Sequence, residues 1–180
     1  MIRTERLLLR PARLSDLADF HDILCRPQAM EYWSTPPHPN LATTEKWLAE
    51  TVARDPAVTV EFAVEFQGRV IGKAGGGDMP EIGYIFHPDY WGQGFAIEAM
   101  RAVVGHAFET QPVDHLLADI DPRNPASRRL LLRLGFHYSH HTDNTFCIDG
   151  TWVHSDFYIL PRPVWRQATE PGFHTPGPVE

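Results

Sequence analysis

The chain has 180 residues, of which 43% are hydrophobic and 22% are charged, and its formal net charge is −7. This length and composition are typical of one globular domain that buries a full-sized core. The acidic balance argues against a nucleic-acid partner, which would favour a basic face, and no apolar run is long enough to span a membrane.

The first quarter of the chain predicts a strand followed by a helix. Residues 6–10 are expected to form a short strand that Pro11 ends, because proline removes a backbone donor. Ser15 or Asp16 can cap the helix. Its apolar residues recur at helical spacing before Pro27, and they are Leu17, Phe20, Ile23 and Leu24.

A proline-rich segment at residues 32–40 separates this helix from a second one. Its three prolines fix φ and remove backbone donors, so an ordered loop is predicted. Its aromatic pair, Tyr32 and Trp33, either lines a substrate cleft or covers the edge of the core. Thr43 or Thr44 is expected to open the second helix, which carries Trp47, Leu48 and Val52 on one face.

The clearest strand lies at residues 58–67, where apolar side chains alternate with a period of two. Gln67 and Gly68 form the expected turn into a second strand at residues 69–74, so the pair is a hairpin. Consecutive glycines then lead to a third strand at residues 81–86. Because no Gly-Lys-Ser/Thr follows those glycines, a nucleoside-triphosphate P-loop is excluded.

A glycine-bearing turn, Trp91-Gly92-Gln93-Gly94-Phe95-Ala96, follows the third strand and opens a helical pattern that runs to Phe108. N–H groups at the start of a helix lack intrahelical acceptors and lie at its positive end, so they can bind a phosphate. Glycines also let a bulky anion approach the backbone. The turn is therefore either the cradle of a cofactor's pyrophosphate or a ligand-free connection between strand and helix.

The second half of the chain predicts a strand at residues 115–120, a helix at residues 127–134 that ends at Gly135, and a hairpin that turns at Asp149–Gly150. Beyond Trp165 the chain is rich in proline and glycine. We therefore expect one domain at residues 1–165 and a flexible tail at 166–180. The expected fold class is α+β, with a mixed, largely antiparallel, twisted sheet of about seven strands flanked by about four helices.

Three motifs occur in a characteristic order along the chain. The first joins Glu81-Ile82-Gly83-Tyr84-Ile85-Phe86 to the glycine-bearing turn, the second joins Asn124-Pro125-Ala126-Ser127 to Leu134-Gly135-Phe136, and the third and weakest is the final hairpin with Gly150, Trp152, Asp156 and Tyr158. Together they resemble the GCN5-related N-acetyltransferase (GNAT) superfamily, and more closely its ribosomal-protein N-terminal acetyltransferase (RimJ/RimL-like) branch. The superfamily's pyrophosphate signature falls on Trp91, Gly94 and Ala96. Trp91 replaces the usual Gln or Arg, as is common in this branch.

The resemblance implies a GNAT fold that binds acetyl-CoA between the strands 81–86 and 115–120, which splay apart where the acyl group enters. It implies that backbone groups of Ile85 and Phe86 hold the pantetheine arm and the thioester. The side chain of Asn124 would bond the pantetheine, and Ser127 would lie near the sulfur. The pyrophosphate would lie on the turn formed by Trp91, Gly92, Gln93, Gly94, Phe95 and Ala96.

Acetyl transfer to an amine needs a base, a donor to the developing oxyanion and a hydrogen bond to the departing thiolate. The resemblance makes Glu81 the candidate base, although it could be an exposed carboxylate at a strand end. Many superfamily members carry a tyrosine four residues before the closing glycine, but here that position is Leu131. Ser127, one helical turn earlier, is either the partner of the sulfur or the N-cap of its helix. Tyr84 and Tyr138 are substitutes, and Tyr84 is also a candidate substrate contact.

The ten histidines do not predict a metal site. His140 and His141 are adjacent, so their rings point to opposite faces of a strand, and no cysteine or carboxylate is recognised at ligand spacing. Cys25 and Cys147 form no redox motif, so we expect free thiols in a reducing compartment. The charged N-terminus does not resemble a signal peptide, and the expected location is cytoplasmic.

The predicted function is that of an acetyl-CoA-dependent N-acetyltransferase. It would move an acetyl group to a primary amine, on a protein N-terminus or a small molecule, by direct transfer in a ternary complex. The alternative is an acyl-CoA-binding sensor or scaffold domain without turnover. The expected partners are acetyl-CoA and an amine acceptor, without nucleic acid or membrane, and the superfamily precedent suggests a homodimer.

Overall fold

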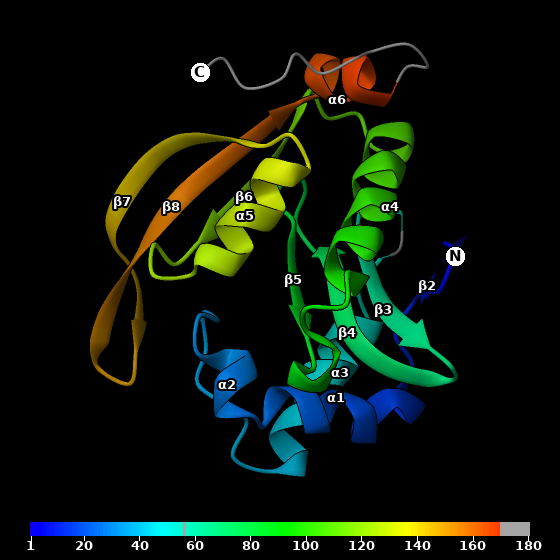
Figure 1. Cartoon of the computed structure of the whole chain (residues 1–180). Helices are drawn as coiled ribbons and strands as arrows, with labels where there is room; N and C mark the ends of the chain where they lie inside the picture. The colour runs from blue at the N-terminus through cyan, green and yellow to red at the C-terminus, as the bar shows by residue number, and fades with distance from the viewer. Residues whose placement is uncertain (56, 170–180) are drawn as a thin grey trace.

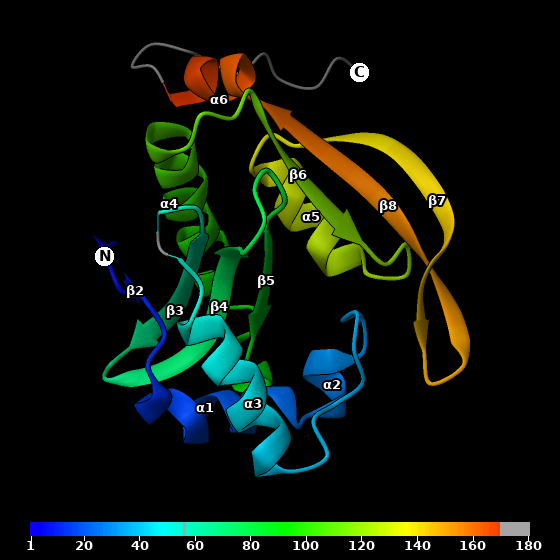
Figure 2. The ribbon, with the colours of Figure 1, turned by 180° about the vertical axis from the view of Figure 1, so that it is seen from behind.

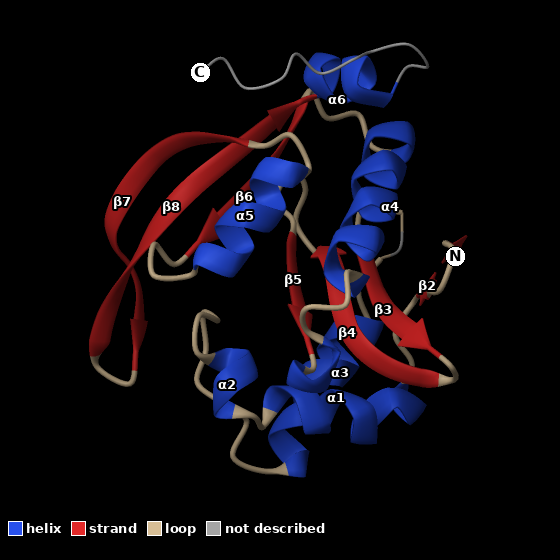
Figure 3. Cartoon of the chain, in the orientation of Figure 1, coloured by secondary structure: helices blue, strands red, loops and turns tan. Residues whose placement is uncertain are grey.

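The structure is a computed structural model that describes residues 1–55 and 57–169. This part of the chain contains eight strands and six α-helices (Figure 1, Figure 3). The strands are β1 (Ile2–Arg3), β2 (Leu8–Arg10), β3 (Val60–Phe66), β4 (Arg69–Gly76), β5 (Gly83–Phe86), β6 (His115–Ile120), β7 (His137–Ile148) and β8 (Thr151–Pro161). The helices are α1 (Leu17–Leu24), α2 (Pro27–Met30), α3 (Leu41–Val52), α4 (Phe95–Thr110), α5 (Pro125–Arg133) and α6 (Arg162–Thr169).

The strands form two antiparallel sheets. One has the order β1-β2-β3-β4-β5 and the other has the order β6-β8-β7. A parallel bridge between Glu81 and Leu117 joins the two sheets just ahead of β5. The predicted mixed, largely antiparallel architecture is therefore confirmed, with two-residue β1 as the strand that the sequence pattern did not reveal.

Two hydrophobic clusters fill the two faces of the five-stranded sheet. Helix α4 covers one face, and α1 with α3 covers the other (Figure 1, Figure 2). Alternation along β3 directs Val60, Phe62 and Val64 into the cluster that contains α4, whereas Ala63 joins the cluster of α1 and α3. The strand predicted for residues 58–67 is shorter in the structure, because Val58 belongs to a turn and is exposed.

The helix caps differ from those predicted. Asn40 caps α3, because its Oδ1 accepts a hydrogen bond from the Thr43 N–H at 3.0 Å, so the prediction of Thr43 or Thr44 is wrong. Asp16 stands at the start of α1 but makes no capping bond. Its carboxylate instead forms a buried ion pair with Arg10 at 2.8 Å, which raises the pKa of the guanidinium.

Replacing Asn40 with alanine is expected to lower the free energy of unfolding by about 1 kcal/mol, because the Thr43 N–H loses its acceptor. Urea unfolding followed by circular dichroism measures the change. Glu50→Ala is the matched control, since Glu50 is exposed within the same helix, and it should change the free energy by less than about 0.5 kcal/mol. Equal stabilities of the two variants would contradict the cap.

The C-terminal region follows the prediction as far as the hairpin. β7 and β8 pair antiparallel around a turn in which Asp149 and Gly150 both have positive φ. Helix α6 crosses the predicted domain boundary, so a flexible tail starting at residue 166 is wrong for 166–169; residues 170–180 lie outside the described part of the chain. The ring of Trp165 lies 6.4 Å from that of Phe108, so α6 contacts α4.

None of the described helices combines the length and the hydropathy of a membrane span.

Candidate active site

Strands β5 and β6 diverge from a common point. At the bridge, Ile82 N donates to Leu117 O and Leu117 N donates to Pro80 O, each at 2.9 Å. Beyond the bridge β5 pairs with β4 and β6 pairs with β8, so the two strands separate. The resulting cleft has a volume of about 910 Å³. The strands therefore splay where the sequence analysis expected them to.

The glycine-bearing turn forms one wall of this cleft. Gly92 and Gly94 have φ angles of 73° and 82°, and Gly94 is the N-cap of the 16-residue α4. The N–H of Glu98 makes the first bond of the helix, to Gly94 O, and residues 92–97 find no acceptor for their N–H groups among the described residues. A Cβ at Gly92 would meet nothing within 4 Å. The turn thus offers open N–H groups at a positive helix end, which is a geometry that binds phosphate.

Arg6, in the N-terminal segment, contacts the glycine-bearing turn through its guanidinium group. Its Nη1 donates to Gln93 O at 3.0 Å, its Nε pairs with Glu98 at 2.7 Å, and its guanidinium lies 4.2 Å from the centre of the Phe95 ring. Burial alone would raise the pKa of Glu98, but the hydrogen bonds from Thr4 and Arg6 hold it below its ordinary value. No motif in the sequence singles out Arg6, because its partners lie about ninety residues away.

Along β5, the backbone N–H and C=O groups of successive residues point alternately toward β4 and toward the cleft. The bond from the His87 N–H to β4, together with the strand register, makes Phe86 part of a non-hydrogen-bonded pair. The N–H and C=O groups of Tyr84 and Phe86 therefore face the cleft, while those of Ile85 bond β4. Trp91 Nε1 donates to the Phe86 carbonyl at 2.9 Å, which leaves the Phe86 N–H directed into the cleft. The Ile85 backbone, which was expected to hold the cofactor together with that of Phe86, is therefore engaged with β4, and the groups that face the cleft are those of Tyr84 and Phe86.

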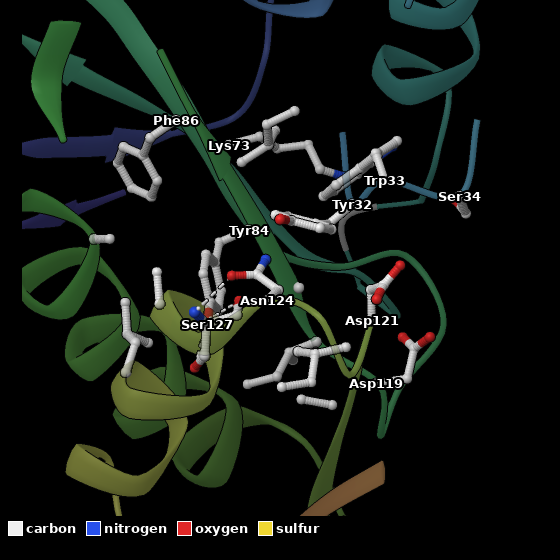
Figure 4. Close-up of a pocket in the computed structure, with 18 of the residues that line it drawn as sticks. Tyr32, Trp33, Ser34, Lys73, Tyr84, Phe86, Asp119, Asp121, Asn124 and Ser127 are labelled. Carbon is white, nitrogen blue, oxygen red and sulfur yellow. Dashed lines mark hydrogen bonds between the residues drawn. The ribbon is translucent and has the colours of Figure 1, made fainter. Parts of the chain in front are cut away.

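Tyr84 and Ser127 meet across the cleft (Figure 4). The Tyr84 Oη lies 2.6 Å from the Ser127 Oγ. Asn124 Oδ1 accepts from the Ser127 N–H at 3.0 Å, so Asn124 rather than Ser127 caps α5. With that oxygen engaged, the NH₂ group of Asn124 is the part that can donate to a ligand. Burial raises the pKa of Tyr84 to about 12, so its phenol remains protonated at neutral pH.

Leu131, which occupies the superfamily's tyrosine position, is completely buried in the core. It offers neither a proton donor nor contact with the cleft. The other substitute, Tyr138, lies on β7 and does not contribute to the lining of the cleft. Among the described tyrosines, Tyr84 is therefore the one that meets Ser127.

Carboxylates gather near the point where β5 and β6 meet. Glu81 stays exposed to solvent, as the alternative reading of a strand-end carboxylate expected, but partial desolvation, followed by the charges of Asp119 and Asp78, raises its pKa. Burial also raises the pKa of Asp119, whose carboxylate accepts a hydrogen bond from Ser155 Oγ at 3.2 Å. None of the three acids forms an ion pair with a described lysine or arginine. Sequence reasoning missed Asp119, although an acid in the otherwise apolar stretch 115–120 was a usable signal.

The aromatic pair of the proline-rich loop reaches the same cleft. Tyr32 and Trp33 follow α2 and line the opening (Figure 4). The guanidinium of Arg123 lies 6.0 Å from the Tyr32 ring, and the Lys73 amino group lies 5.8 Å from the Trp33 ring. The pair therefore lines the cleft, and Trp33 also covers the edge of the core, because it packs against the cluster of α1 and α3.

Comparison with known protein families identifies the family to which this chain belongs. Residues 6–137 match the family model described as "Acetyltransferase (GNAT) domain". The chain belongs to the GNAT acetyltransferase family. The matched range includes the splayed strands, the glycine-bearing turn and all of α5, so the candidate site lies inside this GNAT domain.

Three curated relatives were compared with this GNAT domain. The uncharacterized N-acetyltransferase p20 of Bacillus licheniformis is 29% identical over 151 residues, which cover 74% of this chain and 80% of p20. The ribosomal protein uS5 alanine N-acetyltransferase of Escherichia coli is 31% identical over 84 residues, 47% of this chain and 43% of that enzyme. YkkB of Bacillus subtilis is 44% identical over 59 residues, 33% of this chain and 34% of YkkB. The chain thus spans less than half the length of the last two relatives.

Solved structures show that the fold is shared. An acetyl transferase of Salmonella typhimurium that modifies the N-terminal serine of a 50S ribosomal subunit protein superposes with a TM-score of 0.77 at 16% identity, covering 88% of this chain and 96% of that one. The microcin C7 self-immunity acetyltransferase MccE, in complex with acetyl-CoA and AMP, gives 0.78 at 11% identity, with coverages of 87% and 93%.

The cleft of this GNAT domain suits acetyl-CoA as the acetyl donor. The open N–H groups of residues 92–97 match the acceptors of a pyrophosphate, and the space beside Gly92 leaves room for it. The unpaired edge of β5 offers donors and acceptors that an amide-bearing pantetheine arm can use. The residues that line the cleft therefore have the donors and acceptors that acetyl-CoA needs.

Proposed function

We propose that this GNAT domain transfers the acetyl group of acetyl-CoA directly to a primary amine in a ternary complex. The observation that carries the proposal is the position of Glu81 in a group of carboxylates at one end of the cleft, where desolvation and then the charges of Asp119 and Asp78 raise its pKa. A negative site attracts the cationic form of an amine. A carboxylate whose pKa is raised toward neutrality is also a better base than an ordinary one.

The proposed chemistry uses four groups of the chain. Glu81 accepts a proton from the bound ammonium, so the amine nitrogen can attack the thioester carbonyl carbon. The Phe86 N–H donates to the carbonyl oxygen as it gains negative charge. The carbon–sulfur bond then breaks, and the Ser127 hydroxyl donates to the departing thiolate while Tyr84 donates to the Ser127 Oγ. The attacking nitrogen gives its second proton to the thiolate, so the products are an N-acetylated amine and the coenzyme A thiol, and Glu81 returns its proton to solvent.

The Tyr84–Ser127 pair should act as one unit on the thiolate. Tyr84→Phe and Ser127→Ala are each expected to lower kcat by about 10- to 100-fold, the range for hydrogen bonds to charged groups. The double variant should be no slower than the slower single variant, because either change breaks the same chain of bonds. Tyr138→Phe is the control and should leave kcat unchanged. Additive effects of the two substitutions would contradict a shared role.

The acceptor belongs to one of two classes of primary amine. A protein N-terminus is supported by the similarity to the uS5 alanine N-acetyltransferase, and a small polyamine by the shared fold of a spermidine N-acetyltransferase from Vibrio cholerae. The acidic end of the cleft suits the ammonium group of either class. Thiol release from acetyl-CoA, followed with peptides starting in alanine or serine and with spermidine, separates the classes, and mass spectrometry confirms the acetylated product.

A second candidate function is an acyl-CoA sensor without turnover, and the observation that favours it is the buried leucine at the superfamily's tyrosine position. The same assay decides between the two functions. Tight acetyl-CoA binding without amine-dependent thiol release, across both classes of acceptor, would support the sensor and overturn the transferase. Homodimer formation and the absence of nucleic-acid and membrane partners stay predictions.

A further inference from the structure

Two histidines and an aspartate meet on the β7–β8 hairpin, outside the acetyl-transfer machinery. His141, Asp143 and His154 each offer one ligand atom, and these atoms all lie within 4.8 Å of one another. Asp143 Oδ1 lies 3.2 Å from His141 Nε2 and 2.9 Å from His154 Nδ1. All three side chains are exposed, so an ion can reach them from solvent. The expectation that no carboxylate lies at ligand spacing from these histidines is therefore wrong.

The hairpin's irregular register produces this arrangement. His141 lies opposite Asp156 in the ladder, and the register shifts between Thr142 and Phe146. Within that shift Asn144 adopts a positive φ of 55°, so the strand bends there. The bend brings Asp143 back toward the two imidazoles, whose rings are stacked with centres 5.8 Å apart. A regular strand of alternating side chains would not place these three residues together.

Asp156 adds a feature common to metal sites in proteins. Its Oδ1 lies 2.8 Å from the Nδ1 of His141. A carboxylate that accepts the N–H of one ring nitrogen fixes the plane of the ring and directs the other nitrogen at an ion. That other nitrogen, Nε2, lies 3.2 Å from Asp143 Oδ1, so an ion that binds there replaces the proton of this contact. The pair therefore has the orientation of a carboxylate–histidine–metal triad.

We propose that His141, Asp143 and His154 bind a divalent transition-metal ion of the zinc type. Zinc bonds to imidazole and carboxylate are about 2.0–2.2 Å, so the ligand atoms of a tetrahedral site lie roughly 3.3–3.5 Å apart. The separation of Asp143 from His141, 3.2 Å, is close to that spacing, whereas its separation from His154, 2.9 Å, is shorter and the two histidine ligand atoms are within 4.8 Å of each other. An ion would therefore move the side chains slightly apart and replace the bond that the Asn144 N–H makes to His154 Nδ1. Imidazole ligands favour zinc, copper or nickel over magnesium and calcium. The three ligands leave a fourth position for water or an external ligand.

The site borders the acceptor side of the cleft. His154 and its neighbour Ser155 line the cleft. A bound ion would tie β7 to β8 beside the cleft and so stiffen the hairpin there. The metal site itself does not depend on which amine the enzyme acetylates.

Calorimetric titration of ZnCl₂ into the tag-free, chelator-treated full-length protein tests the site. The expected stoichiometry is one ion per chain. His154→Asn and Asp143→Asn should each weaken binding by about a hundredfold, and Asp156→Asn by about tenfold, because it only orients His141. Co²⁺ in place of Zn²⁺ should give the visible absorption of a tetrahedral centre, and that band should be lost in His154→Asn.

His140→Asn is the matched control. His140 is the neighbouring histidine on β7, stacks on Phe157 and lies outside the cluster, so its replacement should leave zinc affinity unchanged. Unchanged far-UV circular dichroism of every variant shows that the fold is intact. The proposal is overturned if the wild-type protein takes up no zinc, or if His154→Asn and Asp143→Asn bind it as tightly as His140→Asn does.

Discussion

Gly92→Val is expected to weaken acetyl-CoA binding by roughly 10²- to 10⁴-fold. A Cβ at this position points into space that is empty of protein atoms within 4 Å, beside N–H groups that have no acceptor among the described residues. A branched side chain there would keep a pyrophosphate from at least two of these donors. Each hydrogen bond to a charged group contributes about 1.5–3 kcal/mol, and about 1.4 kcal/mol corresponds to a tenfold change in affinity.

The chain contains a matched control for this substitution. Gly68 lies in the β3–β4 turn with φ of 80°, close to the 73° of Gly92, and a Cβ there also meets nothing within 4 Å. Gly68→Val therefore imposes a similar backbone strain at a residue that does not line the cleft, and it should leave the Kd for acetyl-CoA, measured by calorimetry, unchanged. Equal losses of affinity in the two variants would attribute the effect to strain and contradict the pyrophosphate assignment.

Glu81→Gln is expected to lower kcat/KM for the amine by roughly 10²- to 10⁴-fold, the range for removing a general base. Glu81 acts when it is deprotonated, so the rate of the wild-type enzyme should rise as pH rises through its pKa. Because burial and the nearby acids raise that pKa, this limb of the profile should lie above the ordinary titration range of a glutamate. In Glu81→Gln the limb should flatten while the Kd for acetyl-CoA stays the same.

Asp119 is the competitor for the role of base, because it is more buried than Glu81 and lines the same end of the cleft. The two acids influence each other, so the measured pKa values belong to the pair. Asp119→Asn should shift the acidic limb toward lower pH by removing a negative neighbour, with a smaller loss of rate. If Asp119→Asn abolishes the limb and Glu81→Gln keeps it, the base is Asp119.

Local patterns were sufficient to predict much of the fold. The bounds of β6 agree with the predicted strand 115–120, because apolar residues dominate it and turn residues flank it. The turn at Gln67–Gly68 was predictable because a glycine, which tolerates positive φ, separates two strand patterns, and both residues do adopt positive φ. The caps were harder to predict, since Asn40, Thr43 and Thr44 have similar capping chemistry and only the geometry selects Asn40.

The parts of the site that lie in one stretch of the sequence were predictable. The residues that reach the site from distant parts of the sequence were not. The glycine-bearing turn and the segment from Asn124 to Ser127 each carry their function in one stretch of chain. Arg6 and Asp119 enter the site through contacts that span 87 and 36 residues of sequence. Asp143 reaches His154 only because β7 bends. Neither long-range contacts nor a bulge leave a periodic pattern in the sequence.

The contacts of Arg6 give the amino terminus a part in ligand binding. Through Gln93 and Glu98, this residue connects the first strands to the turn that faces the pyrophosphate. Coupling between two parts of a protein is reciprocal, so a ligand that orders the turn also holds the terminal segment in place by the same free energy. Acetyl-CoA should then protect the first residues from proteolysis, and truncation of the chain before residue 7 should damage a site that lies far along the sequence.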